Sequence, residues 1–247
     1  NMKLALFDDY RLGIIAGDSI LDATKIFDGI NFRRPQDMME DVITGWTKIK
    51  PEIEKAIKGL QGVPVGRVRL RPPLPRPPKI ICAAVNYLEF GQREPADFEA
   101  FLKPPTAVIG HGDICELPPN TDVSVFHHEA ELAFVIGEAA SNVIPSEAMK
   151  HVFGYCNFLD MSARGLSPNG RPSFFLGKSW HTFAPLGPAL VTADEIPDPD
   201  KLHVRLWNND EPRHDYPTSD MSIKVPELLS EISKVTTLEP GDVVSTG

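Results

Sequence analysis

Hydrophobic positions divide the first seventy residues into short strands followed by helices. The apolar content and length of three stretches predict strands at residues 3–7, 11–17 and 19–27. Gly17-Asp18 supplies a turn between the last two. Over residues 36–60, apolar side chains recur at the spacing of one helix face. Pro51 is expected to divide this region into two helices, because proline suits a first helical turn better than an interior.

A proline-rich segment follows this unit. RPPLPRPPK, residues 71–79, contains five prolines, which neither donate ladder hydrogen bonds nor continue a helix. A stiff spacer is therefore expected at 71–78, between a small N-terminal domain (1–70) and a larger domain (79–247). The chain stops shortly after the turn signal EPGD, so we expect the larger domain to be incomplete at its C-terminal end.

The larger part reads mainly as strands. Strands, with turns between the later ones, are expected at 79–87, 106–113, 127–137, 154–164, 174–180, 184–192, 203–210 and 211–220. Helices are expected at Asp97–Leu102, at Ser146–Phe153 with Ser146 as its cap, and at residues 226–235. Many strands with few helices predict an α+β, β-rich fold with a rolled or barrel-like core.

Composition excludes several classes of protein. The net charge of −9 over 247 residues argues against nucleic-acid binding, which needs clustered Lys and Arg. No apolar run approaches the ~18 residues of a membrane span, and no signal peptide is expected. Cys82, Cys115 and Cys156 form no CxxC pair, which favours reduced thiols and a cytoplasmic protein.

The motif Glu129-Ala-Glu131 carries the strongest chemical signal. In a strand, residues i and i+2 face the same way, so both carboxylates project from one face. The residues that follow, LAFVI, predict a strand buried on both faces, where two like charges are costly unless a cation binds them. Oxygen ligands favour Mg²⁺, Mn²⁺ or Ca²⁺. The alternative is a solvated face of an edge strand. Asp160, in another apolar segment, is a natural third ligand, although alone it is more often a turn residue or a cap.

Two further features could hold an anionic substrate. Lys178 follows Gly177 amid aromatic residues, where a partly desolvated ammonium can hold an enolate or carboxylate. The alternative is a surface lysine whose stem covers apolar groups. Thr246-Gly247 ends a strand in a form that lets backbone N–H groups approach an anion.

The ordered set of motifs resembles the fumarylacetoacetate hydrolase family. The matching stretches are KIICAAVNY, FLKPPTAVIGHGD, HHEAELAFVIG, GYCNFLDMSAR, GKSWHTFAPLGPALVT and TLEPGDVVSTG. The resemblance covers nearly all of residues 79–247, and the N-terminal unit is similar to the small domain of many bacterial members. It implies a mixed β-roll catalytic domain with a small N-terminal α+β domain, a homodimer, and a Mg²⁺ or Mn²⁺ site, with Ca²⁺ possible in crystals.

The resemblance also implies roles for particular residues. The metal ligands map onto Glu129, Glu131 and Asp160, and Lys178 matches the active-site lysine. The residues expected to bind substrate are Tyr87, Arg164, Thr182, Thr246 and Gly247. Family members cleave or rearrange 1,3-diketo and 2-oxo acids, so a small oxo-acid is the expected substrate, with neither a nucleic acid nor a membrane as a partner.

The sequence departs from the family where hydrolytic members carry a His and, three residues later, a Glu. Phe90 stands in the His position and Arg93 in the Glu position, and phenylalanine cannot transfer a proton. Arg93 and Glu94 become candidate catalytic residues of a lid over residues 87–101. Other candidate bases are Glu89, His127, His128, His181 and His214, each histidine being more often structural. The chemistry could also need no such base.

Three hypotheses follow from these observations. The first is a metal-dependent hydrolase that breaks a C–C bond in an acylpyruvate or similar 1,3-diketo acid. The second keeps the metal site but makes the protein a decarboxylase, isomerase or dehydratase of a 2-oxo acid, which the Phe90 substitution favours. The third is a catalytically silent homologue that binds a metabolite, against which the costly carboxylate pair argues.

Overall fold

The computed structural model describes residues 2–119, 123, 125–166 and 173–247. The strands are β1 (Lys3–Phe7), β2 (Arg11–Ala16), β3 (Ser19–Asp22), β4 (Val63–Pro64), β5 (Leu70–Arg71), β6 (Ile80–Ala83), β7 (Ala100–Lys103), β8 (Val108–Ile109), β9 (Phe126–Ile136), β10 (Val152–Ala163), β11 (Ala184–Thr192), β12 (His203–Asn208), β13 (Glu211–Pro217) and β14 (Val243–Ser245). The α-helices are α1 (Pro35–Thr44), α2 (Trp46–Ile57), α3 (Pro145–Ala148), α4 (Phe174–Lys178) and α5 (Val225–Val235).

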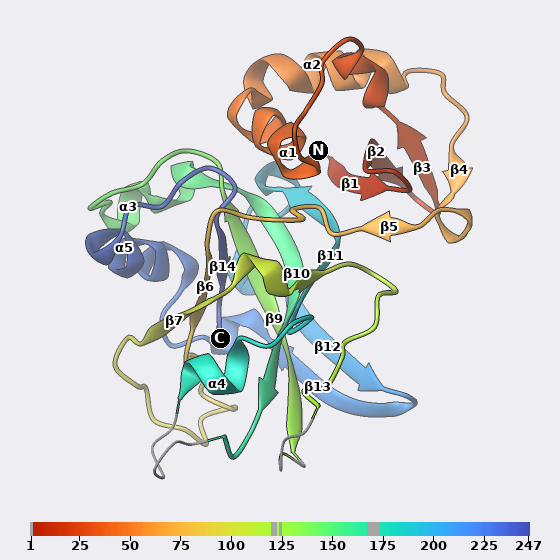
Figure 1. Ribbon diagram of the computed structural model, residues 1–247. Helices are drawn as coiled ribbons and strands as arrows, with labels where there is room; N and C mark the ends of the chain where they lie inside the picture. The colour runs from red at the N-terminus through yellow and green to blue at the C-terminus, as the bar shows by residue number, and fades with distance from the viewer. Residues whose placement is uncertain (1, 120–122, 124, 167–172) are drawn as a thin grey trace.

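Most strands join one mixed sheet (Figure 1). Its order over the described residues is β4-β3-β2-β1-β11-β10-β9-β14-β6-β7, with β5 beside β1 and β8 beside β11. β14 runs parallel to β6 and β8 parallel to β11, whereas the other pairs in this sheet are antiparallel. β12 and β13 form a separate hairpin. A mixed, strand-rich sheet with few helices confirms the predicted α+β fold class.

The sheet curls strongly between β10 and β7. In the strand order these two are four spacings apart, which in a flat sheet is about 19 Å at ~4.8 Å per spacing. Lys103 of β7 nevertheless donates a hydrogen bond to Asp160 of β10 at 2.5 Å. A lysine side chain is far too short to cross a flat sheet of this width, so the sheet is rolled around the space between these strands.

The N-terminal unit contains β1 to β3, α1 and α2, seen as the red and orange part of Figure 1. The predicted helix break at Pro51 is wrong, because Pro51 lies inside α2 and the break falls at Gly45. The Gly45 N–H closes α1 on the Asp41 carbonyl at 2.9 Å, and a Cβ on Gly45 would lie 2.8 Å from that oxygen. This close approach requires a glycine.

The N-terminal unit shares its sheet with the rest of the chain. Lys3 and Leu4 of β1 pair with Val191 and Leu190 of β11. The proline-rich segment contributes the fully buried Leu74 to a core that also contains residues from both sides of it. The domain division at 71–78 stays a prediction.

Several predicted elements of the larger part are wrong in type or extent, and the strands expected at 79–87 and 106–113 shrink to Ile80–Ala83 and Val108–Ile109. Residues Ala100–Lys103 pair with β6 as the strand β7, although a helix was expected at Asp97–Leu102. Residues 174–178 form the helix α4, although a strand was expected at 174–180. The Ser173 hydroxyl caps the first turn of this helix by accepting a hydrogen bond from the Leu176 N–H at 3.3 Å. The helix expected from Ser146 is the single turn α3 followed by a 3-10 turn, and Ser146 does not cap it.

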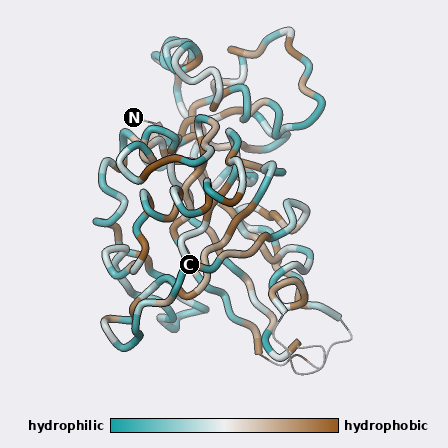
Figure 2. The backbone as a smooth tube through the Cα atoms, turned by 90° about the vertical axis from the view of Figure 1, so that its left-hand side faces the viewer, coloured by the Kyte–Doolittle hydropathy of each residue, from teal (hydrophilic) through white to brown (hydrophobic). Residues whose placement is uncertain are grey.

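The two longest strands of the sheet, β9 and β10, lie at its centre (Figure 1). The second half of β9, Ala130–Ile136, is buried throughout, as the LAFVI run predicts. In both views the C-terminus lies in the middle of the molecule, with hydrophilic segments along much of its outside (Figure 2). Over the described residues, helices are all too short or too polar to cross a membrane.

Candidate active site

Three acidic side chains meet on one face of the sheet where β9 and β10 pair. Glu129 and Glu131 are two residues apart on β9, so both project to the same side. Asp160 of β10 lies directly opposite Glu129 in the antiparallel register. One carboxylate oxygen from each of the three residues lies within 4.8 Å of the other two. The alternation of side chains along β9 therefore places Glu129 and Glu131 together, and the register between β9 and β10 places Asp160 beside them.

Burial intensifies the repulsion among these carboxylates. Glu131 is 5% exposed and Asp160 is 2% exposed, whereas Glu129 is half-buried. Burial, followed by the charge of Asp160, raises the pKa of Glu131 to about 8. Burial alone would raise the pKa of Glu129, but the Lys178 and Arg164 cations hold it below its usual value. Without a bound metal, protonation of Glu131 and these cations relieve the repulsion.

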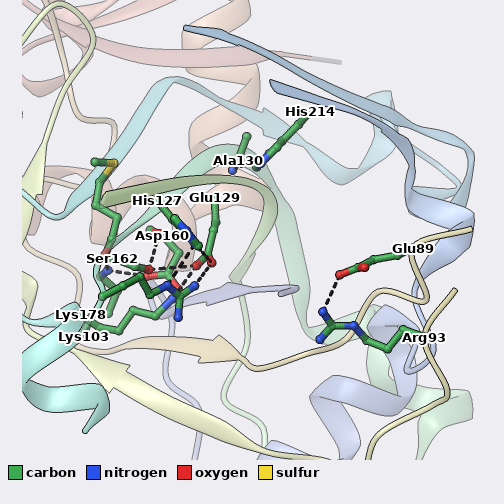
Figure 3. A network of polar contacts seen from close by, with 12 residues as sticks. Glu89, Arg93, Lys103, His127, Glu129, Ala130, Asp160, Ser162, Lys178 and His214 are labelled. Carbon is green, nitrogen blue, oxygen red and sulfur yellow. Dashed lines mark hydrogen bonds and ion pairs between the residues drawn. The ribbon is translucent and has the colours of Figure 1, made fainter. Parts of the chain in front are cut away.

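Two lysines from separate elements reach the carboxylates (Figure 3). Lys178, the last residue of α4, donates to Glu129 Oε2 at 2.6 Å and also to Asp160 Oδ2. Lys103, the last residue of β7, donates to Asp160 Oδ1 at 2.5 Å and to the Met161 carbonyl at 2.9 Å. Burial would lower the pKa of Lys178, but the charges of Asp160 and Glu129 raise it above its usual value. The Lys178 ammonium therefore stays charged.

The residues at and after the end of β14 lie beside Glu131. The Ser245 hydroxyl donates to Glu131 Oε2, and the Gly247 N–H donates to the same oxygen at 3.2 Å. The Tyr87 hydroxyl lies 3.2 Å from Thr246 Oγ1, so it is held next to this segment. Tyr87, Thr246 and Gly247, expected from the sequence to bind substrate, are thus gathered on one side of the cluster.

Arg164 approaches Glu129 from the end of β10. Its guanidinium donates to Glu129 Oε1, and its Nε donates to His127 Nδ1 at 3.1 Å. The Ser162 hydroxyl donates to Glu129 Oε2 at 3.0 Å. Both oxygens of Glu129 therefore have partners within the site.

Three of the predicted site residues lie outside this network of contacts. Arg93 pairs with Glu89 at 2.6 Å in the loop between β6 and β7, and Figure 3 shows this pair apart from the carboxylates. Glu94, the next residue, is exposed. Thr182 accepts a hydrogen bond from the Glu116 N–H at 2.7 Å, and among the described residues its hydrogen bonds do not reach the carboxylates. The roles of Arg93, Glu94 and Thr182 stay predictions.

The hairpin β12–β13 supports the backbone between the two glutamates. His214 Nδ1 accepts a hydrogen bond from the Ala130 N–H at 3.2 Å, and the Tyr216 hydroxyl donates to the Ala130 carbonyl. Burial, followed by the nearby His128, lowers the pKa of His214, so its ring is neutral near pH 7. The structure therefore gives His214, one of the candidate bases, a hydrogen-bonding role beside the cluster.

Sequence reasoning did not single out Lys103, Ser162 or Ser245. Ser162 could have been found, because it lies two residues after Asp160 on the same face of β10. Ser245 directly precedes Thr246-Gly247, the pair that the sequence predicted to bind an anion. Lys103 was missed because the residues before it were expected to be helical, which hides their alternation in a strand.

The donor set fits a hard divalent cation. Glu129, Glu131 and Asp160 offer only carboxylate oxygens, which suit Mg²⁺, Mn²⁺ and Ca²⁺ better than softer metals. Adjacent lysines, serines and backbone N–H groups hold these carboxylates in place, as is usual around metal ligands. The fold and the site together define the class of this protein: it is rolled and strand-rich, with an acidic site for a divalent metal.

Comparison with known proteins identifies the family. The chain belongs to the fumarylacetoacetate hydrolase family, because the family described as "Fumarylacetoacetate (FAA) hydrolase C-terminal" matches residues 79–247. Its relatives include a hydrolase and a tautomerase, and this protein is an enzyme of the same family.

Three relatives bear on the activity. Maleylpyruvate hydrolase of Aquipseudomonas alcaligenes is 35% identical over 263 aligned positions, which cover 100% of this chain and 89% of the relative. Oxaloacetate tautomerase YisK of Bacillus subtilis is 39% identical over 190 positions, covering 74% of this chain and 62% of that protein. The crystal structure of maleylpyruvate hydrolase from Sphingobium sp. SYK-6, in complex with manganese(II) and pyruvate, has a TM-score of 0.88 and 36% identity, covering 100% of this chain and 88% of that one.

Proposed function

We propose that this protein is a metal-dependent hydrolase that cleaves a C–C bond in an acylpyruvate-type oxo-acid. The observation that carries the proposal is the cluster of Glu129, Glu131 and Asp160, whose carboxylate oxygens lie close enough together to hold a divalent cation. The similarity to maleylpyruvate hydrolases supports it further, because it extends over the whole chain. In this reaction, water adds across the bond between the acyl carbonyl carbon and the pyruvate unit, releasing a carboxylic acid and pyruvate.

The residues around the cluster suit such a substrate. A bound divalent metal would act as a Lewis acid toward the oxo and carboxylate oxygens of the substrate. Lys178, which stays charged, would donate to the oxygen on which negative charge develops as the C–C bond breaks. Arg164, Tyr87, Thr246 and Gly247 would bind the substrate carboxylate and orient the chain of the acid.

The proton-transfer groups would come from the loop between β6 and β7. Phe90 cannot act as a base, so we assign proton transfer to Glu94, with Arg93 binding an anionic part of the substrate. Both residues are accessible in the structure, and the ion pair of Arg93 among the described residues is with Glu89 of its own loop. This assignment requires the loop to close over the carboxylates when substrate binds.

A second candidate is isomerisation or decarboxylation of a 2-oxo acid at the same site. The absence of the His and Glu pair favours it, since keto–enol conversion needs no activated water. The 39% identity to oxaloacetate tautomerase YisK supports it as well. That similarity covers 74% of the chain, whereas the similarity to maleylpyruvate hydrolase covers all of it. Hydrolysis is therefore preferred.

The same proposal includes Mg²⁺ or Mn²⁺ as the native metal and a cytoplasmic homodimer. Hard oxygen ligands support the choice of metal. The absence of CxxC pairs and the three free cysteines support a reducing compartment. Sedimentation of the purified protein tests the dimer.

A coupled assay tests the reaction. Purified protein with Mn²⁺ or Mg²⁺ is expected to convert maleylpyruvate to maleate and pyruvate, with pyruvate followed through lactate dehydrogenase and maleate by chromatography. A chelator should abolish the activity of the wild type, and added metal should restore it. The Glu131→Ala variant should stay inactive even with added metal. Keto–enol conversion or CO₂ release from oxaloacetate, without any maleate from maleylpyruvate, would favour the second candidate. Full activity of Glu131→Ala would refute the site.

A further inference from the structure

Lys103 is a fully buried cation that belongs to no substrate-binding group named above. Its side chain is 0% exposed, and its ammonium contacts Asp160 Oδ1 at 2.5 Å, with the Met161 carbonyl at 2.9 Å. The Phe183 ring lies 6.0 Å away. Burying an ammonium is costly unless it is paired and hydrogen-bonded. The fold therefore places a buried ammonium, which is costly to desolvate, against one oxygen of the predicted metal ligand Asp160.

The position of Lys103 differs from that of Lys178. Lys178 lies between Glu129 and Asp160 and contacts an oxygen of each, so a metal bound by these carboxylates would compete with it. Of the described carboxylates, Lys103 contacts Asp160 alone, on the other oxygen, and its second hydrogen bond is to a backbone carbonyl. Lys103 can therefore keep its contacts whether or not a metal is bound.

Glu131 is held in a comparable way. Its Oε2 accepts hydrogen bonds from the Ser245 hydroxyl and the Gly247 N–H, and among the described residues Oε1 has no hydrogen-bond donor. Asp160 Oδ1 is likewise occupied by Lys103, which leaves Oδ2. Each of the two most buried carboxylates of the cluster can thus offer one oxygen while the contacts on its other oxygen are kept, with Lys178 releasing Asp160 Oδ2 to the metal.

We propose that Lys103 is a positioning residue that restricts Asp160 to a single metal-ligating oxygen and thereby favours Mn²⁺ and Mg²⁺ over Ca²⁺. The inference rests on the proposed function, because it concerns the same metal site. Ca²⁺ takes six to eight oxygens and often binds carboxylates through both, whereas Mg²⁺ requires a tight octahedron with few protein ligands. Holding Oδ1 removes the two-oxygen mode that Ca²⁺ would use.

The test compares metal affinities of folded variants by isothermal titration calorimetry. Lys103→Met removes both the charge and the donor, and Lys103→Gln keeps an N–H donor without the charge. Lys79→Met is the matched control, because Lys79 pairs with Glu239 at 2.9 Å and Asp242 at 2.8 Å, outside the cluster. Each protein is titrated with Mn²⁺, Mg²⁺ and Ca²⁺, after circular dichroism has shown that it is folded.

Lys103→Met is expected to bind Mn²⁺ and Mg²⁺ about 10- to 100-fold more weakly, which is the usual effect of losing a partner of a metal ligand. Its affinity for Ca²⁺ should fall much less, so the ratio of the Mn²⁺ and Ca²⁺ affinities shrinks. Lys103→Gln should lie between Lys103→Met and the wild type, and it decides the question if Lys103→Met does not fold. Lys79→Met should keep the wild-type ratio.

Two results would overturn the inference, and they are distinguishable. If the wild type binds Mn²⁺ and both Lys103 variants keep its Mn²⁺/Ca²⁺ ratio, Lys103 does not position Asp160, and the proposed function stands. If the wild type binds none of the three cations, the proposed function and the role of Lys103 both fail.

Discussion

Glu129 and Asp160 lie directly opposite each other across the ladder of β9 and β10, so two carboxylates share one cross-strand position. Like charges at such a position destabilise a sheet. Here Lys178 contacts both residues, and its ammonium partly offsets the repulsion. The same arrangement makes the centre of the sheet responsive to any divalent cation that binds these two side chains.

Metal should therefore stabilise the folded protein. At a Mn²⁺ concentration of about 100 times Kd, binding to the folded state alone adds about 2.7 kcal/mol to the free energy of unfolding. We expect Mn²⁺ to raise the melting temperature over that in chelator, and Glu131→Ala to remove this response. Differential scanning fluorimetry measures both. An equal Mn²⁺ response in Glu131→Ala would place the metal elsewhere.

Lys178→Met should separate catalysis from metal binding. Loss of the donor at the developing negative charge is expected to lower kcat about 10²- to 10³-fold, as for other groups of this kind. The affinity for Mn²⁺ should not fall, because Lys178 contacts the same oxygens of Glu129 and Asp160 that a metal would use. Kinetics and calorimetry on the same preparation check the two effects. A large loss of Mn²⁺ affinity would show instead that Lys178 holds the carboxylates in place.

Glu94→Gln tests the loop between β6 and β7. If Glu94 transfers the proton, its amide variant should lose about 10²- to 10⁴-fold in kcat for maleylpyruvate, while Mn²⁺ binding is unchanged. Glu89→Gln is the matched control on the same loop, since Glu89 is engaged by Arg93. Steady-state kinetics across pH provides the measurement. Wild-type kcat in Glu94→Gln would remove this residue from the mechanism.

Asp194, just after β11, pairs with Lys50 of α2 in the N-terminal unit and should make stability depend on pH. Thr192 donates to its Oδ1 at 2.5 Å and Lys50 of α2 donates to its Oδ2 at 3.0 Å. The Thr192 hydrogen bond, followed by that of Lys50, lowers the pKa of Asp194 to about 2. Because this lies below the unfolded value of about 3.9, the stabilisation is present above about pH 4 and is lost as pH falls toward 2.

The replacement Asp194→Asn should therefore lower the free energy of unfolding at pH 6 and lower it less at pH 3. Urea unfolding of both proteins at the two pH values gives the difference. An equal difference at pH 6 and pH 3 would mean that ionisation of Asp194 does not contribute to stability.

The sequence by itself determined the features that depend on neighbours along the chain. The period of two in a strand placed Glu129 and Glu131 on one face, and the apolar run after them predicted the buried half of β9. The order of six motifs indicated the family that residues 79–247 match. Local patterns also gave the strand-rich fold class, because alternation and turn signals need no knowledge of distant contacts.

Only the tertiary structure decided which distant groups meet the two glutamates. Asp160 faces Glu129 because of the register between β9 and β10, and Lys103 reaches Asp160 because the sheet curls. A helix was expected at Asp97–Leu102, but residues 100–103 form β7 instead, because they pair with β6. Register, curl and edge pairing depend on hydrogen bonds between segments far apart in the chain, which no local pattern of residues encodes.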